Sequence, residues 1–194
     1  MMKIKEVKTA FKIANVILDE EHKVREFKFD FCNELFDDHG DKLNKNILTD
    51  DKGRVYLIVV DGIIKKIGGS MSRGGIKATL SFYQDAMQGR PGISRFGTHI
   101  LIKEALDKGS KVEIYMISSE EIEAPVKGLF SDKGEMQKVA VFKEMEDKCK
   151  ADYKVKENNY PDWNFQENGK PWPTYIQEKH NQYLSTTIGK KEKS

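Results

Sequence analysis

The amino-acid sequence predicts an α+β domain in which a small mixed β-sheet is flanked by helices. The clearest signal lies in residues 54–70, where two apolar runs meet at Asp61-Gly62 and so indicate a β-hairpin. Residues 111–118 alternate between polar and apolar side chains, as in a half-buried strand. Helices are expected over residues 76–88, 95–108, 142–154 and 174–185.

Three parts follow one another along the chain. Residues 1–48 are expected to form an N-terminal helical arm, with helices over 3–19 and 24–39, because apolar residues recur there every three or four positions. Residues 52–168 form the core, and residues 169–194 form a C-terminal extension that ends in a basic tail. Within the core, segments 123–130 and 137–142 indicate a further strand pair.

The composition gives no sign of a strongly charged, zinc-binding or membrane-spanning protein. The chain has 194 residues and a formal net charge of +2, so any anion-binding surface must come from local clustering of basic residues. The two cysteines, Cys32 and Cys149, show no zinc-ligand spacing and are expected to be reduced, part-buried thiols. No apolar run is long enough to span a membrane. We therefore expect a soluble, cytoplasmic protein with no membrane partner.

The predicted hairpin carries a polar residue near the outer end of each strand, Tyr56 and Lys66. A two-residue turn at Asp61-Gly62 would place them on opposite sides of the sheet. A three-residue loop with Gly62 in the left-handed conformation would place Tyr56 directly opposite Lys66. We predict the three-residue loop, because only that loop brings the two polar groups into one site.

The residues of this hairpin resemble the core of the GIY-YIG nucleases. Val55-Tyr56 stands on the first strand, Lys66-Ile67-Gly68 stands on the second, and Gly69-Ser70 and a helix follow. No Gly-Ile precedes Tyr56, and Lys66 stands where the family usually has tyrosine, as in a subgroup of GIY-YIG type II restriction endonucleases. Glu146 on a late helix and the downstream Asn164 complete a resemblance that covers about residues 54–167.

The resemblance implies hydrolysis of phosphodiesters with one divalent metal, Mg²⁺ or Mn²⁺, held by Glu146. Independently of the resemblance, such hydrolysis needs a base that activates water. Tyr56 has an ordinary pKa near ~10 and needs a neighbouring cation to act as that base. Lys66 is either that cation or, with a pKa lowered by desolvation, the base itself. The residues alone leave both assignments open.

Two glutamates compete for the role of metal ligand. At about 100° per residue, Glu144 lies opposite the apolar stripe of its helix, whereas Glu146 borders that stripe beside Cys149 and Tyr153. A carboxylate at the border can reach into a cleft, where it suits Mg²⁺, which takes few carboxylates and keeps several waters. We therefore assign the ligand to Glu146.

A cation for the scissile phosphate is expected near the start of the helix that follows the hairpin. Arg73 and Lys77 are the catalytic candidates, and Arg95, which stands four residues before His99, is an alternative. Basic residues without acidic neighbours in this region suit contact with the DNA backbone. The candidate DNA-binding residues are Ser70, Arg73, Lys77, Tyr83, Arg90, Arg95 and Asn164.

The function expected from these residues is a sequence-specific endonuclease of the type II restriction class, acting on double-stranded DNA. A homodimer would suit cleavage of both strands at a symmetric site, and the N-terminal arm is a candidate for dimer or DNA contacts. The alternatives are a homing or DNA-repair nuclease with the same core, and a non-catalytic DNA-binding module on the same fold.

Overall fold

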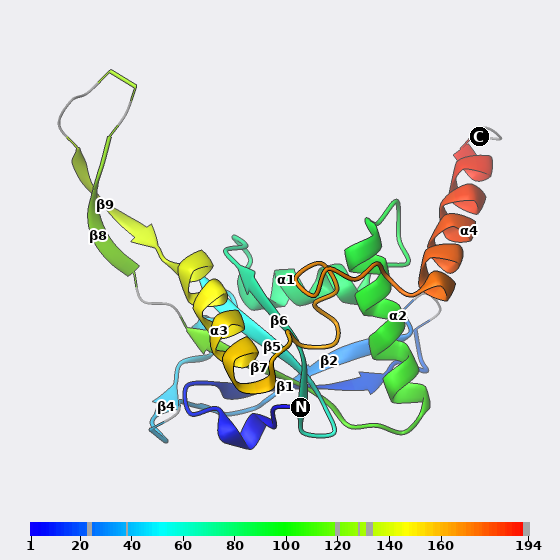
Figure 1. Cartoon of the computed structure of the whole chain (residues 1–194), viewed down its shortest axis with the longest axis horizontal. Coiled ribbons are helices and arrows are strands. Elements are labelled where there is room, and N and C mark those ends of the chain that lie inside the picture. Colours follow the sequence, from blue (N-terminus) through cyan, green and yellow to red (C-terminus); the bar gives the residue numbers. More distant parts are fainter. Residues whose placement is uncertain (23–24, 38, 119–120, 128, 131–133, 192–194) are drawn as a thin grey trace.

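A five-stranded antiparallel sheet forms the centre of the protein, with the strand order β2-β1-β7-β5-β6 (Figure 1). Every neighbouring pair of strands is antiparallel, so the α+β class is confirmed but the sheet is not mixed. The computed structural model describes residues 1–22, 25–37, 39–118, 121–127, 129–130 and 134–191. The strands of the sheet are β1 (Phe11–Leu18), β2 (Phe27–Phe31), β5 (Arg54–Val60), β6 (Ile63–Ser70) and β7 (Val112–Ser118).

The N-terminal part is not a helical arm. The predicted helices over 3–19 and 24–39 are wrong, because β1 and β2 occupy these segments and lie in the central sheet. Phe27, Phe29 and Phe31 recur at a period of two, and their alternation with charged residues fits a strand at least as well as a helix. Val24 lies outside the described residues. The short elements of this part are η1 (Ile4–Glu6), β3 (Leu35–Phe36), β4 (Lys42–Leu43) and η2 (Lys45–Leu48).

The hairpin of β5 and β6 turns through two residues. Asp61 (φ 49°) and Gly62 (φ 77°) both lie in the left-handed region, as a type I′ turn requires, and Val60 pairs with Ile63. The prediction of a three-residue loop is therefore wrong, although the predicted positive φ of Gly62 is confirmed.

A β-bulge nevertheless brings Tyr56 and Lys66 to the same face. The register shifts by one residue after Val59 pairs with Ile64, so that Lys65 is the extra residue, and Ile58 faces Lys66. Further along, Tyr56 faces Gly68. Directly paired residues share a face, and so do residues two apart on one strand. The predicted shared face is therefore present, by means of a bulge instead of a longer loop.

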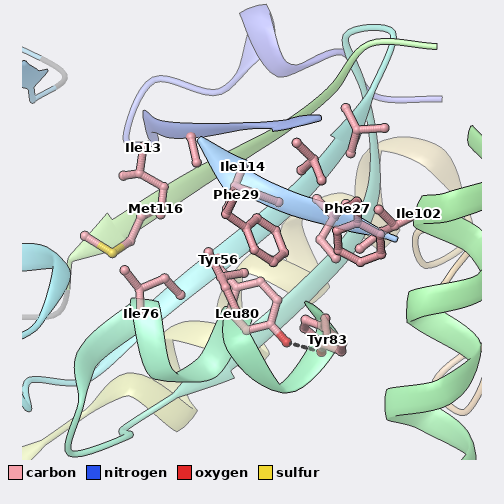
Figure 2. Packing of buried hydrophobic residues seen from close by; sticks show 14 of the residues in the cluster. Ile13, Phe27, Phe29, Tyr56, Ile76, Leu80, Tyr83, Ile102, Ile114 and Met116 are labelled. Atoms are coloured by element: carbon pink, nitrogen blue, oxygen red, sulfur yellow. Dashed lines mark hydrogen bonds between the residues drawn. The ribbon is translucent and has the colours of Figure 1, made fainter. Parts of the chain in front are cut away.

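Helices cover both faces of the sheet. On one face α1 (Gly75–Gln84) and α2 (Ile93–Asp107) enclose the larger core, where Tyr56 packs beside Leu80 and Tyr83 (Figure 2). On the other face α3 (Phe142–Glu157) packs over β5 and β6. The last helix, α4 (Thr174–Lys191), packs on α2.

The remaining core elements follow the sequence. The helices expected over 76–88, 95–108 and 142–154 and the strand over 111–118 are confirmed as α1, α2, α3 and β7, with shifts of a few residues at their ends. The expected strand pair is β8 (Glu121–Val126) with β9 (Glu135–Ala140), and Gly128 between them lies outside the described residues.

The C-terminal helix is longer than expected, since α4 extends to Lys191, and residues 192–194 of the basic tail lie outside the described part. Cys32 and Cys149 are free and part-buried, as expected. Among the described helices, none is both long enough and apolar enough to cross a membrane.

The turn gives a test of the hairpin geometry. We expect Gly62→Ala to lower the free energy of unfolding by about 1–2 kcal/mol, the cost of a left-handed conformation for a residue with a Cβ. No heavy atom lies within 4 Å of a Cβ at this position, so the loss would be conformational and not steric. Gly62→Asn is the control and should lose less, because asparagine tolerates this conformation. Urea unfolding that ranks the alanine variant equal to wild type would contradict the turn assignment.

Candidate active site

Two consecutive glycines on β6 let side chains from both faces of the sheet meet at its edge. A Cβ on Gly68 would lie 2.5 Å from Cζ and the hydroxyl of Tyr56, and a Cβ on Gly69 would lie 2.5 Å from Oε2 of Glu146. No real side chain fits at such distances. The pair Gly68-Gly69 therefore leaves room for Tyr56 over one face and for Glu146 over the other.

The hydroxyl of Tyr56 is buried and shares a hydrogen bond with the hydroxyl of Tyr83 at 2.6 Å (Figure 2). Burial raises the pKa of Tyr56 well above its ordinary value, and the neighbouring Tyr83 and the negative charge of Glu146 raise it further. Burial also raises the pKa of Tyr83. Both phenols therefore keep their protons at neutral pH. Because the two hydroxyls share a single hydrogen bond, the hydrogen of one hydroxyl can be donated to a third group.

Glu146 lies on α3 at the border of the helix's apolar stripe, as predicted, and its side chain is 13% exposed. Its Oε1 lies 2.6 Å from Nζ of Lys150, and its Oε2 lies 3.7 Å from Nζ of Lys143. Lys150 also contacts Glu167 at 2.5 Å. Burial disfavours the Lys150 ammonium, but hydrogen bonds to both carboxylates outweigh that cost and raise its pKa. Glu144 is exposed, again as predicted.

Lys66 is the second buried cation of this group, with only 9% of the residue exposed. Desolvation lowers the pKa of its ammonium, and the charge of Lys150 lowers it further, while Glu167 and Glu146 act in the opposite direction. In the described part of the chain its ammonium makes no hydrogen bond or ion pair. A lysine in such a desolvated position loses its proton more readily than an exposed lysine does.

Asn164 has a structural role that its sequence position did not reveal. Its Oδ1 accepts a hydrogen bond from the Ile67 backbone N–H, and its Nδ2 donates to the Ile67 carbonyl, both at 2.9 Å. The same Nδ2 donates to Glu167 at 3.2 Å, and the backbone N–H of Trp163 donates to the Lys65 carbonyl at 2.8 Å. The segment around Asn164 thus pairs with the outer edge of β6 and fixes the strand between Lys66 and Gly68.

The structure separates the two catalytic candidates for the phosphate-binding cation. Arg73 is exposed in the loop that follows β6 directly. Lys77 is exposed in the first turn of α1 but lies over the ring of Phe31 at 5.0 Å, and Phe31 is on β2, the strand at the opposite edge of the sheet from β6. Ser70 ends β6, and its hydroxyl contacts that of Thr79 at 2.5 Å.

The other basic candidates lie away from this group. Arg90 is exposed between α1 and α2. Arg95 is partly buried and donates hydrogen bonds to the carbonyls of Phe82 and Asp85 (2.6 Å for Asp85) at the end of α1. His99 is fully buried, with one ring nitrogen 2.7 Å from the Tyr83 carbonyl and the other 2.6 Å from Glu26. The side chains of Arg95 and His99 therefore both link α2 to the end of α1.

Two members of the candidate site were missed in the sequence, Lys150 and Glu167. Lys150 stands four residues after Glu146, the spacing at which side chains of a helix meet, so this contact was accessible to sequence reasoning. Glu167 stands three residues after Asn164, in a loop, and no periodic pattern points to it.

Glu146 is the carboxylate of this group that the sequence analysis assigned to a divalent metal. In this structure both of its oxygens are approached by ammonium groups, those of Lys150 and Lys143, which a bound cation would have to displace. The described residues contain no cluster of three or more histidine, cysteine or acidic side chains suited to a metal. Mg²⁺ or Mn²⁺ held by one carboxylate, waters and a phosphate is compatible with this donor set, whereas a closed zinc site is not.

Comparison with solved structures identifies the fold. A mutant of bacteriophage T4 EndoII superposes with a TM-score of 0.50 at 19% identity, over 84% of this chain and 99% of that chain. Restriction endonuclease HPY188I in complex with product DNA has a TM-score of 0.44 at 16% identity, over 82% of this chain and 84% of that chain. No protein-family model and no curated protein sequence matches the chain. The likeness to EndoII establishes a shared fold.

The contacts of Asn164 with β6 give a test of this part of the site. Asn164→Ala leaves the buried N–H and C=O of Ile67 without their partners, and each unpaired group costs about 1–3 kcal/mol. We expect a matching fall in the free energy of unfolding, measured by urea denaturation. Asn181→Ala, at an exposed position on α4, is the control and should change little. Equal stability of the two variants would show that the contacts with Ile67 are dispensable.

Proposed function

We propose that the protein is a metal-dependent endonuclease of the GIY-YIG type that cleaves double-stranded DNA at specific sequences, as type II restriction enzymes do. The observation that carries this proposal is the convergence of Tyr56, Tyr83, Lys66 and Glu146 at one edge of the sheet, next to the loop of Arg73. The fold shared with bacteriophage T4 EndoII supports it.

Lys66 is the group that we assign to activate water. A general base must lose its proton near the working pH, and desolvation lowers the pKa of Lys66 toward that range. Tyr56 is less suited to this role, because burial and Tyr83 raise its pKa. The hydroxyls of Tyr56 and Tyr83 instead act as hydrogen-bond donors. One hydroxyl donates to the other, and the hydrogen of that second hydroxyl orients the attacking water or a phosphate oxygen.

Glu146 is the residue that would hold the metal. A divalent ion bound there would offset negative charge on the phosphate and assist departure of the 3′ oxygen. Lys150 holds the same carboxylate in place in the free protein, and Glu167 gives the ammonium a second partner when Glu146 is engaged elsewhere. Lys150 and Glu167 therefore act as positioning residues for the Glu146 side chain.

Arg73 is best placed of the basic candidates to contact the scissile phosphate, because its loop follows directly from the strand that carries Gly68 and Gly69. Lys77 and Arg90 are exposed cations that suit contacts with the DNA backbone further from the cut. Ser70, Arg95 and Asn164 have structural partners, so we assign them to holding the site in shape.

Cleavage of plasmid DNA tests the proposal. We expect discrete fragments with Mg²⁺ or Mn²⁺ and none with EDTA. Glu146→Gln should abolish the metal-dependent cleavage while leaving the fold and specific DNA binding intact, because the amide loses the charge that holds the cation. Glu144→Gln, two residues away on the exposed face of the same helix, should cleave like wild type.

Other outcomes of the cleavage assay would support the alternative functions. Nicking of particular junctions would indicate a repair nuclease, and intact DNA bound in a stable complex would indicate a non-catalytic module. A dead Glu144 variant beside an active Glu146 variant would refute the assignment of the metal ligand.

Neighbouring lysines give a matched test of the base. We expect Lys66→Ala to reduce kcat by about 10²–10⁴-fold, the typical loss for removal of a general base, with little change in DNA affinity. Lys65→Ala is the control, since Lys65 pairs with Asp162 at 2.7 Å. Among the described residues, its side chain makes no hydrogen bond or ion pair with Tyr56 or Glu146. Single-turnover cleavage rates measure both variants. A Lys66 variant that cleaves like the Lys65 variant would leave Lys66 without a catalytic role.

A further inference from the structure

Lys150 is a buried ammonium group that two carboxylates share. Its Nζ lies 2.6 Å from Oε1 of Glu146 and 2.5 Å from Oε1 of Glu167. The Lys150 side chain is only 11% exposed, and that of Glu146 is nearly as buried. Salt screens such a partly buried pair much less than it screens an exposed one. Any cation that binds Glu146 therefore competes with an ammonium group that already contacts the same carboxylate.

The two carboxylates have less freedom than the lysine between them. Glu146 lies directly over the backbone of β6, so that a Cβ on Gly69 would be 2.5 Å from its Oε2. Glu167 accepts a hydrogen bond at 3.2 Å from Nδ2 of Asn164, whose side chain is itself hydrogen-bonded to the backbone of Ile67 on β6. Both carboxylates are thus held at the edge of the sheet, and the lysine is the member of the group that can move.

A pocket of about 490 Å³ beside the lysine provides room for this movement. In the described part of the chain, its lining includes Lys150 and Glu167 together with Asp147 and Gln166, but not Glu146. The ammonium group can therefore leave Glu146 toward this pocket while it keeps its contact with Glu167. The flexible four-carbon stem of a lysine suits such a change of position.

We propose that Lys150 and Glu167 together set the affinity of Glu146 for a divalent metal. Lys150 occupies the carboxylate of Glu146 in the free protein, and it moves onto Glu167 when a cation takes its place. Lys150 thus lowers the affinity for the cation and Glu167 raises it, although neither residue is a metal ligand. The proposal rests on the proposed function, which makes Glu146 the metal-binding carboxylate.

Binding of Mn²⁺ to the free protein, without DNA, tests the competition. The electron paramagnetic resonance signal of unbound Mn²⁺ measures the affinity. Lys150→Met should raise the association constant by about tenfold or more, the factor that corresponds to one hydrogen bond between charged groups. Lys150→Gln is a second variant in case Lys150→Met fails to fold, which circular dichroism would reveal.

Lys148→Met is the matched control for the loss of a positive charge. Lys148 stands on the same helix, two positions from Glu146, but it is exposed and pairs with Asp152. Its removal should leave the Mn²⁺ affinity near that of wild type. An increase as large as that of Lys150→Met would show a general effect of charge on α3 and refute the direct competition.

Glu167 provides a test with the opposite sign. Glu167→Gln should lower the Mn²⁺ affinity, because Lys150 loses its second partner and remains on Glu146. In the Lys150→Met background the same change should have a much smaller effect, since the lysine through which Glu167 acts is absent. A loss that is equally large in both backgrounds would make Glu167 a metal ligand and contradict its assignment as the partner of Lys150.

The outcomes separate this proposal from the proposed function. Equal Mn²⁺ affinities of wild type and both Lys150 variants overturn it, even if the protein cleaves DNA. Tighter binding by the Lys150 variants supports it, even if no DNA is cleaved, provided that Glu146→Gln abolishes the gain. A gain that persists in the combined variant Lys150→Met, Glu146→Gln would place the ion on other residues and refute the proposal.

Discussion

The free edge of β6 is the feature on which the candidate site depends. An edge strand leaves backbone groups unpaired, and Asn164 satisfies two of them at Ile67 with a side-chain amide that imitates a neighbouring strand. Immediately beyond, Gly68 and Gly69 replace side chains with open space. Tyr56 and Glu146 use this space from opposite faces. The position of the catalytic candidates therefore follows from backbone geometry before any charge is considered.

The charges of the site form a small group that is largely buried, with Glu167 more exposed at its border. Lys66 and Lys150 stand against Glu146 and Glu167, and Lys150 bridges the two carboxylates. A buried charge is tolerated only when it is paired, and here Lys66 is the member without a direct partner in the described part of the chain. This imbalance is what makes Lys66 chemically distinct from the exposed lysines nearby.

Helical periodicity on α3 was sufficient to predict that Glu146 is more buried than Glu144, because burial on an amphipathic helix follows directly from spacing. The hairpin was predicted in place and with the correct shared face, but for the wrong reason. The bulge at Lys65 depends on contacts with β5 and on the loop around Trp163, and a run of two lysines contains no sign of it.

Strand β2 was missed because Phe27 and Phe31 satisfy both a helical and an alternating pattern. Only their pairing in the central sheet, through β1, decides between the two. The contact of Lys77 with Phe31 was hidden for the same reason, since it joins segments that the sequence placed in separate parts. Long-range pairing is thus the information that local pattern lacked.

The strand order has a consequence for how the chain reaches this fold. Strand β7 lies between β1 and β5, and pairs Met116 with Phe11 and Ser118 with Arg54. The β1–β2 and β5–β6 pairs can form locally, but the sheet cannot close until residues near 118 are available to join them. Such distant pairing slows folding, and until it is complete the facing edges of β1 and β5 are open to intermolecular association during synthesis.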